Sequence, residues 1–247
     1  MFVNQSKDSY DRTTEQYVVA YLDILGVTAR IKQPDDDMLS MNKLHNLYTF
    51  SMELTEKIAI EGNKDIKFKI FSDNIIIAKK TTSETLRDDI YCVLSCVGHF
   101  QELAASDRVG WLLRGGITIG SLFIDDVMVW GKALLRAYEL EDKIAIYPRV
   151  IIDDIVIQNI LEDDKSYGFI RCDNDGFAFL NYLHNCHFVG EMLMNGFELM
   201  KKEAGSTPND KVLQKLIWHK NFVNKELENK KEKGQKKFRL HYLDERG

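Results

Sequence analysis

The feature that most constrains the fold of this chain is the alternation of short apolar runs with longer amphipathic stretches. Residues 16–25, 66–71 and 75–78 are rich in β-branched and aromatic side chains, which predicts strands. Residues 38–60 carry apolar side chains near helical spacing after three consecutive aspartates, which predicts an amphipathic helix. The order already indicates that strands and helices share one sheet-based fold.

The same alternation continues through the middle of the chain. We expect helices over 84–105 and 132–145, and an apolar run over 111–124 that continues past glycines from one strand into another. A strand at 149–152 and a short helix at 153–161 follow. The order β-α-β-β-α-β-α-β predicts an α+β fold with a mixed sheet and helices on one face.

The last third of the chain has a different character. Residues 169–180 read as a hairpin with Asp175 and Gly176 as its turn signal, and helices are expected over 185–204 and 208–230. We therefore divide the chain into a core over 1–162 and an extension over 163–247 that packs on the core as a hairpin with helices.

Charge and composition exclude several classes of function. The chain has 247 residues, of which 45% are hydrophobic, and a net charge of -5, whereas a nucleic-acid binder normally presents a dominant basic surface. No apolar run is long enough to predict a membrane span. Four cysteines without C-x-x-C spacing, and no apparent signal segment, favour a reducing cytoplasm. We expect neither nucleic acid nor membrane as a partner.

Two aspartates are candidates for chemistry. Asp23 interrupts an apolar strand, which is costly unless the carboxylate is paired or binds a metal, and Asp73 lies at the tip of the 66–78 hairpin. If the hairpin lies beside the first strand, both carboxylates reach one edge of the sheet and can hold hard cations. Taken singly, each also fits a structural role: Asp23 as a cap of the turn before Gly26, and Asp73 as a turn residue.

Three blocks of sequence carry a family resemblance. Y-L-D-I-L-G-V-T from residue 21 and K-I-F-S-D-N-I-I-I-A from residue 69 resemble the two metal-binding motifs of class III adenylate and guanylate cyclases. The third block has two parts: L-R-G-G-I-T-I-G from residue 113 resembles that family's glycine-containing strand, and V-W-G-K-A-L-L-R-A-Y-E-L-E from residue 129 resembles the helix after it. The resemblance spans 17–152 and implies a ferredoxin-like cyclase catalytic core.

The resemblance assigns roles position by position. It makes Asp23 and Asp73 ligands of two divalent ions, Mn²⁺ or Mg²⁺, with the carbonyl of Ile24 as a further ligand. Lys69 falls where purine-specific members read the base, and Met128 replaces the usual acidic base-facing residue. It also implies a nucleoside triphosphate substrate and a homodimer with its sites at the interface, so that the monomer is inactive.

Two positions depart from the family pattern. The transition-state asparagine and arginine would fall at Leu135 and Glu139, which cannot do that work. Arg136 can instead neutralise charge on the α-phosphate, or it can be an exposed helix residue paired with Glu139 or Asp142.

The overall pattern is most similar to the bacterial Pycsar pyrimidine cyclases. That resemblance implies synthesis of cyclic UMP, or of cyclic CMP, in antiphage defence, with UTP favoured over CTP and the product activating a separate effector. The alternative is a catalytically degenerate cyclase-fold nucleotide sensor or dimerisation module, suggested by Leu135 and Glu139. A diguanylate cyclase is set aside because the G-G-D-E-F motif is absent.

Overall fold

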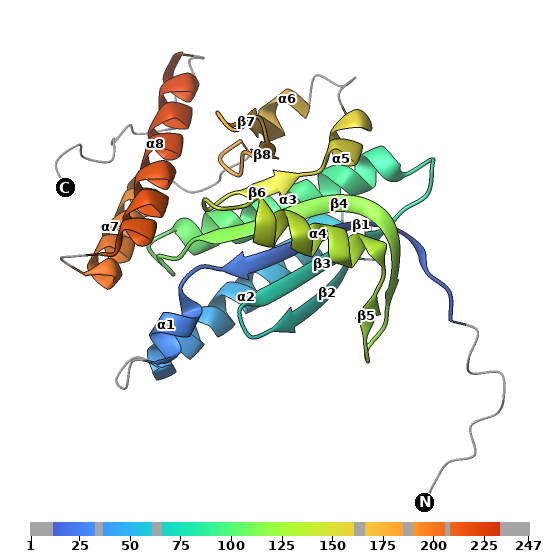
Figure 1. Ribbon diagram of the computed structural model, residues 1–247, viewed down its shortest axis with the longest axis horizontal. Helices are drawn as coiled ribbons and strands as arrows, with labels where there is room; N and C mark the ends of the chain where they lie inside the picture. Colours follow the sequence, from blue (N-terminus) through green and yellow to red (C-terminus); the bar gives the residue numbers. More distant parts are fainter. Residues whose placement is uncertain are drawn as a thin grey trace, which may run out of the picture.

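The computed structural model describes residues 12–32, 37–60, 66–160, 166–184, 190–205 and 208–232 (Figure 1). The strands are β1 (Glu15–Ile24), β2 (Ile66–Phe71), β3 (Asn74–Lys80), β4 (Leu113–Ile124), β5 (Val129–Trp130), β6 (Val150–Ile152), β7 (Ile170–Cys172) and β8 (Ala178–Leu180). The helices are α1 (Val27–Ile31), α2 (Asp37–Ile60), α3 (Leu86–Ala105), α4 (Lys132–Lys143), α5 (Asp154–Gln158), α6 (Ser166–Phe169), α7 (Gly190–Ala204) and α8 (Asp210–Glu232).

The predicted α+β fold with a mixed sheet is confirmed. The strands follow the order β2-β3-β1-β4-β6-β8-β7, with β5 paired to β4. The β4–β6 pair is parallel, whereas the remaining pairs are antiparallel. The first four strands of this order are those of a ferredoxin-like β-α-β-β-α-β unit, in which β1 lies between β3 and β4.

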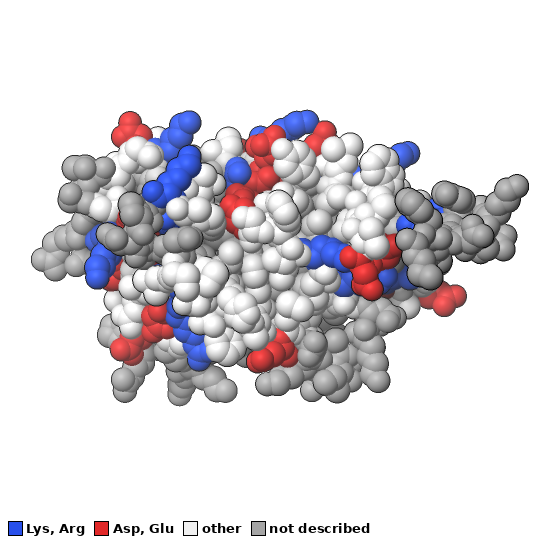
Figure 2. Space-filling model, turned by 90° about the horizontal axis from the view of Figure 1, so that it is seen from below, with Lys and Arg blue, Asp and Glu red and all other residues white. Residues whose placement is uncertain are grey.

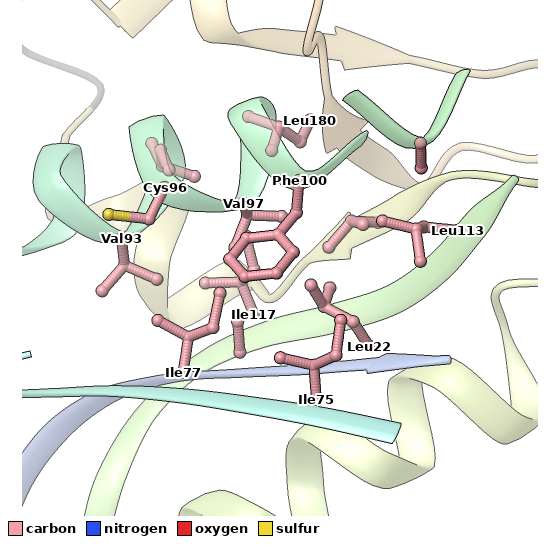
Figure 3. Packing of buried hydrophobic residues seen from close by; sticks show 14 of the residues in the cluster. Leu22, Ile75, Ile77, Val93, Cys96, Val97, Phe100, Leu113, Ile117 and Leu180 are labelled. Atoms are coloured by element: carbon pink, nitrogen blue, oxygen red, sulfur yellow. The ribbon is translucent and has the colours of Figure 1, made fainter. Parts of the chain in front are cut away.

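The main core lies between the sheet and the pair of helices α2 and α3. Phe100 and Val97 of α3 lie over Leu22, Ile77 and Ile117 of the three central strands, and all five side chains are fully buried (Figure 3). Alternate residues of β1 face this core, which is the pattern of a strand buried on both faces. The apolar residues that alternate along the strands therefore form the main hydrophobic core together with those of α3.

The opposite face of the sheet is also covered, which corrects the expectation of helices on one face only. Helix α4 packs there with Ala133 and Ala137 against Val19 of β1 (Figure 1). Gly116 of β4 makes this approach possible, because a Cβ there would lie 2.4 Å from the Cβ of Leu140. The glycines do not divide the 111–124 run into two strands, since β4 is a single strand of 12 residues.

The hairpin expected near 169–180 is confirmed as β7 and β8, and it extends the main sheet through the β6–β8 pair. Its loop is held by Arg149, whose fully buried guanidinium donates to Asp173 at 2.7 Å and to Asp175. Trp218 of α8 donates to the same Asp173 carboxylate at 2.8 Å. Sheet, hairpin and C-terminal helix thus share one polar junction; the boundary at residue 162 stays a prediction.

Three short elements were not predicted: α1, β5 and α6. Each is too short for its periodicity to be recognised, and α1 begins directly after Gly26, which has a φ of 85°. Within the described ranges, no helix combines the length and apolar character that crossing a membrane requires.

Candidate active site

Asp23 and Asp73 belong to neighbouring segments at one end of the sheet. The Ile24 amide donates to the Asp73 carbonyl oxygen at 3.1 Å, and Asp23 is paired with Asn74 of β3 in the strand register. On its other side, Asp23 is paired with Arg114 of β4. The end of β1 therefore lies between the hairpin tip and β4, which brings Asp23 and Asp73 to the same edge.

The hairpin tip is fixed by local contacts rather than by burial. Ser72 has a φ of 56°, a left-handed conformation that its tight turn requires. Its carbonyl accepts a hydrogen bond of 2.7 Å from the hydroxyl of Tyr48 on α2. Asn74 donates to the Asp73 carboxylate at 3.3 Å and accepts from the hydroxyl of Tyr21. The turn is thereby tied to both α2 and β1.

A chain of charges crosses from β1 to α4 beside this edge. Arg114 donates from Nε to the Asp23 carboxylate at 3.0 Å, and its Nη2 lies 2.6 Å from Oε1 of Glu141. Glu141 is buried in α4, and a buried carboxylate needs a charged partner. One guanidinium thus serves two carboxylates, with Asp73 as a third acidic group nearby.

Burial and mutual repulsion disfavour ionisation of these acids. Burial raises the pKa of Asp23, and the Asp73 carboxylate adds to this, whereas Arg114 opposes it. Burial likewise raises the pKa of Glu141 to about 7, with a smaller contribution from Asp23. The pKa of Tyr48 is raised by burial and then by Asp73 and Asp23. This edge therefore carries more negative charge than its own cations balance.

The donor set fits hard divalent ions. Asp23 and Asp73 supply carboxylate oxygens. Ile24 directly follows Asp23, and its amide bonds to Asp73, so its carbonyl is a further oxygen close to both residues. A cation would also relieve the repulsion that raises the pKa of Asp23. In the part of the chain that the structure describes, no group of three or more Asp, Glu, His or Cys side chains surrounds a metal position. The metal roles stay a prediction.

The two residues predicted to face the base lie near one another. Lys67 and Lys69 share the face of β2 opposite Phe68, and Lys67 donates to the Ile124 carbonyl at 3.0 Å. The charge of Lys69 contributes to the lowered pKa of Asp125, whose carboxylate accepts mainly from the amides of Met128 and Val127. The end of β4 therefore contacts β2, and Met128 in the turn that follows is exposed.

Among the described residues, the Arg136 side chain bonds to Asp153 and to neither Asp23 nor Asp73, and Leu135 faces solvent. Leu135 is 60% exposed on α4. Arg136 donates two hydrogen bonds to Asp153, at 2.7 and 3.0 Å, and not to Glu139 or Asp142 as the structural alternative expected. The partner is 17 residues away along the chain and caps α5, a contact that helix spacing alone cannot suggest.

Sequence reasoning missed Arg114, Glu141 and Tyr21 as members of this site. A visible signal existed for Arg114, because it is a lone charge in an apolar strand directly before two glycines. Its partner could not be identified without the register between β1 and β4. Glu141 was hidden because charged residues are common on an amphipathic helix such as α4.

Comparison with known proteins reveals the fold but no close relative. No family model matches the sequence, and no curated protein matches it. The monomeric guanylyl cyclase domain of the RhoGC fusion protein from the aquatic fungus Blastocladiella emersonii matches with a TM-score of 0.53 at 13% identity. That match covers 69% of this chain and 96% of that one.

A second solved structure gives the same result. It is the catalytic core of a rhodopsin-guanylyl cyclase with converted specificity in complex with ATPαS, with a TM-score of 0.51 at 14% identity. The match covers 69% of this chain and 97% of that chain. Both similarities show that the chain has the α+β fold of a class III cyclase catalytic core.

Proposed function

We propose that this chain is a nucleotide cyclase that converts a pyrimidine nucleoside triphosphate, UTP in preference to CTP, into its 3',5'-cyclic monophosphate and pyrophosphate. The class III cyclase fold supports the reaction class. The observation that carries the proposal is the Ile24–Asp73 hydrogen bond, because it holds the Asp23 and Asp73 segments side by side. An unrelated pair of turn aspartates would not need that arrangement.

In the proposed reaction the ribose 3'-oxygen attacks the α-phosphorus, loses its proton, and displaces pyrophosphate as the α–β bridging bond breaks. Asp23, Asp73 and the Ile24 carbonyl would hold two Mn²⁺ or Mg²⁺ ions, which would activate the 3'-hydroxyl and stabilise the leaving group. Arg114 fixes the orientation of the Asp23 carboxylate from the side of β4. The main contribution of the protein would then be to hold the ribose and the triphosphate in the geometry of attack at this edge of the sheet.

The preference for a pyrimidine rests on the base-facing residues. Met128 offers an apolar side chain where an acidic group would read adenine, and its backbone amide is already used by Asp125. Lys69 supplies a cationic side chain from β2, and its charge acts on Asp125, which accepts from the Met128 amide. A smaller base with carbonyl acceptors suits this pair better than a purine amino group.

A homodimer is part of the proposal. Several large apolar side chains are exposed on α4, on the arm formed by β5 and its turn, and at the hairpin tip: Leu135, Tyr138, Val127, Trp130 and Phe71. The face seen in Figure 2 has a broad middle area with few charged side chains. Pairing of such surfaces would bring Arg136 and Leu135 of one chain toward the Asp23 edge of the other.

The biological role proposed is synthesis of a second messenger in bacterial antiphage defence, acting in the cytoplasm. The cyclic product would carry the signal to a separate effector, so no stable protein partner beyond the second copy is required. This role is proposed from the resemblance to the Pycsar cyclases, which rests on D-I-L-G, S-D-N and G-K-A-L-L-R-A-Y-E-L-E followed by a hairpin and helices with W-H-K-N-F.

A second candidate is a cyclase-fold module that binds nucleotide without cyclising it. Two observations favour it: Leu135 stands where the transition-state asparagine is expected, and Arg136 is held by Asp153. Such a module would still require the dimer and the acidic edge for nucleotide binding.

One experiment separates the two candidates. The purified chain is incubated with ATP, GTP, CTP and UTP separately, with Mn²⁺ or Mg²⁺, and cyclic products are measured by mass spectrometry. We expect cyclic UMP as the main product and its loss in Asp73→Asn, whereas Asp88→Asn at the opposite end of the sheet retains activity. Nucleotide binding without any cyclic product would favour the sensor, and purine products alone would contradict the pyrimidine assignment.

A further inference from the structure

A cleft of about 820 Å³ opens beside the acidic edge. Its walls are α1 with the preceding turn at Leu25 and Gly26, the start of α2, the loop before β4, and the C-terminal helices α7 and α8. Figure 1 shows α7 and α8 at the end of the sheet toward which β1 points. The cleft therefore lies between the part of the chain that carries β1, α1, α2 and β4 and the two C-terminal helices.

The cations that line this cleft fall into two groups. Arg30 and Lys43 are neutralised by Glu203 of α7, which accepts from Arg30 at 2.7 Å and from Lys43 at 2.8 Å. Trp111 donates to the same carboxylate at 3.2 Å. Lys202 and Lys215 have no carboxylate within ion-pair distance in the described part of the chain. These contacts fasten α7 to the core and leave two cations for a ligand.

Of these two lysines, Lys215 is the one whose charge acts on residues of the candidate active site. It is half-buried in α8, and its ammonium is among the charges that act on Asp23, Arg114 and Glu141. Burial lowers the pKa of Lys215, and the adjacent Arg114 lowers it further, whereas Asp23 opposes this. A partly desolvated ammonium without an ion-pair partner is costly unless an anion binds to it.

We infer that α8 supplies Lys215 as the cation that contacts the terminal phosphates of the nucleoside triphosphate, so that the C-terminal helices complete the substrate site of their own chain. The cleft borders Leu25 and Gly26, the residues that directly follow the metal-binding segment of β1. A triphosphate held at Asp23 and Asp73 would extend its β- and γ-phosphates into this space. The inference rests on the proposed function for the identity of the ligand.

Charge balance favours this ligand over a simple anion. The edge would hold two divalent ions, two aspartates, Glu141, Arg114 and Lys215, and the cations outweigh these acids. A triphosphate restores the balance, whereas a monophosphate does not reach beyond the metal position. The contact should therefore discriminate between a nucleoside triphosphate and the corresponding monophosphate.

The test uses the full chain and inorganic tripolyphosphate with Mn²⁺ as the probe. Lys215→Met removes the charge, Lys215→Arg keeps it, and Lys225→Met is the matched control at an exposed position of α8. We expect Lys215→Met to weaken tripolyphosphate binding by about tenfold in calorimetry and to raise the KM for UTP similarly, with a smaller change in kcat. Affinity for UMP should not change. Lys215→Arg should retain most of the affinity, and Lys225→Met all of it.

The outcomes separate this inference from the proposed function. If Lys215→Met binds tripolyphosphate as the unmodified chain does, the inference is overturned, even when cyclic UMP is produced. If tripolyphosphate binding depends on Lys215 but no triphosphate is cyclised, the phosphate contact stands and the cyclase proposal fails. Thermal unfolding of each ligand-free variant shows whether a loss of binding reflects a loss of folding, and failure of Lys215→Arg to restore the affinity of a folded protein would also contradict the inference.

Discussion

Two aspartates, Asp23 and Asp153, lie on either side of β4, and each accepts a hydrogen bond from one arginine. Their environments nevertheless shift the carboxyl pKa in opposite directions. Asp153 accepts from Arg136, from the Thr118 hydroxyl at 2.6 Å and from the Asp154 amide. Although burial alone raises its pKa, these hydrogen bonds lower it overall. In the described segments, Asp23 has one side-chain donor, Arg114, which it shares with Glu141, and burial raises its pKa.

The difference separates a carboxylate whose charge is stabilised by several donors within the fold from one that has a single shared donor among the residues that the structure describes. The donors around Asp153 stabilise its charge and hold α5 and α4 against β4. Burial, with a smaller contribution from Asp73, destabilises the charge of Asp23 at the end of its strand. Carboxylates whose charge is destabilised are typical of functional sites, whereas carboxylates with several donors are typical of structural positions.

The largest expected effect is on activity at Asp23. Asp23→Asn should reduce the rate of cyclic nucleotide formation by about 1,000-fold, because an amide is a poor ligand for the proposed ions. Stability should fall little, since burial disfavours the charged form of the Asp23 carboxylate and the amide oxygen of the variant can still accept from Arg114. Product formation and thermal unfolding measured on one preparation test both statements; a folded variant with full activity would contradict the assignment.

Next in size is the pH dependence contributed by Glu141. Burial raises its pKa in the folded chain to about 7, from an ordinary value of 4.5. Its contribution to stability is therefore fully present below about pH 4.5 and is lost as the pH rises through 7. The metal-free chain should lose about 3 kcal/mol from this group over that range. Glu141→Gln should flatten the profile in chemical denaturation, whereas Glu139→Gln on the exposed side of α4 should not.

The contribution of Asp153 to stability should change with pH in the direction opposite to that of Glu141. Asp153→Asn is expected to reduce the free energy of unfolding at pH 7 by about 2 kcal/mol, because Arg136 loses its ionic partner. Since the pKa of Asp153 is lowered, its contribution is present above the ordinary aspartate pKa and is lost as the pH falls through the folded value. Urea unfolding of this variant beside Asp154→Asn tests this; equal stability of the two would contradict the comparison.

The smallest expected effect is stabilisation by the ion alone. Mn²⁺ at ten times its dissociation constant should stabilise the chain by about 1.4 kcal/mol if it binds only the folded state. Asp23→Asn should abolish this gain and Asp153→Asn should leave it intact, which differential scanning calorimetry can resolve. A gain retained in Asp23→Asn would place the ion elsewhere.

Much of the fold was predictable because its elements are long and strongly patterned. The β1 strand and the α2, α3 and α4 helices follow the apolar periodicity of their segments to within a few residues. The face on which α4 packs was not predictable, since it depends on close approach to Gly116 and not on the pattern of α4 itself.

The candidate site was predictable only in part. The juxtaposition of the Asp23 and Asp73 segments follows from hairpin geometry and the resemblance, and the backbone contact between Ile24 and Asp73 agrees with it. The surroundings of these acids depend on register and on distant segments: Arg114 pairs with Asp23 across strands, and Lys215, whose charge acts on Asp23, comes from a helix about 190 residues later. Spacing within a short motif carries no such information.

The β7–β8 hairpin also determines how far this chain can be shortened. The residues of β6 are all buried, and β8 pairs along the side of β6 that would otherwise end the sheet. A fragment ending before the hairpin would present that strand as an open, apolar border, the kind of surface on which polypeptides associate into aggregates. The sheet instead ends at β7, whose outer residues include Arg171 and an exposed Cys172. The segment that follows β6 thus protects the edge of the sheet formed by the preceding strands.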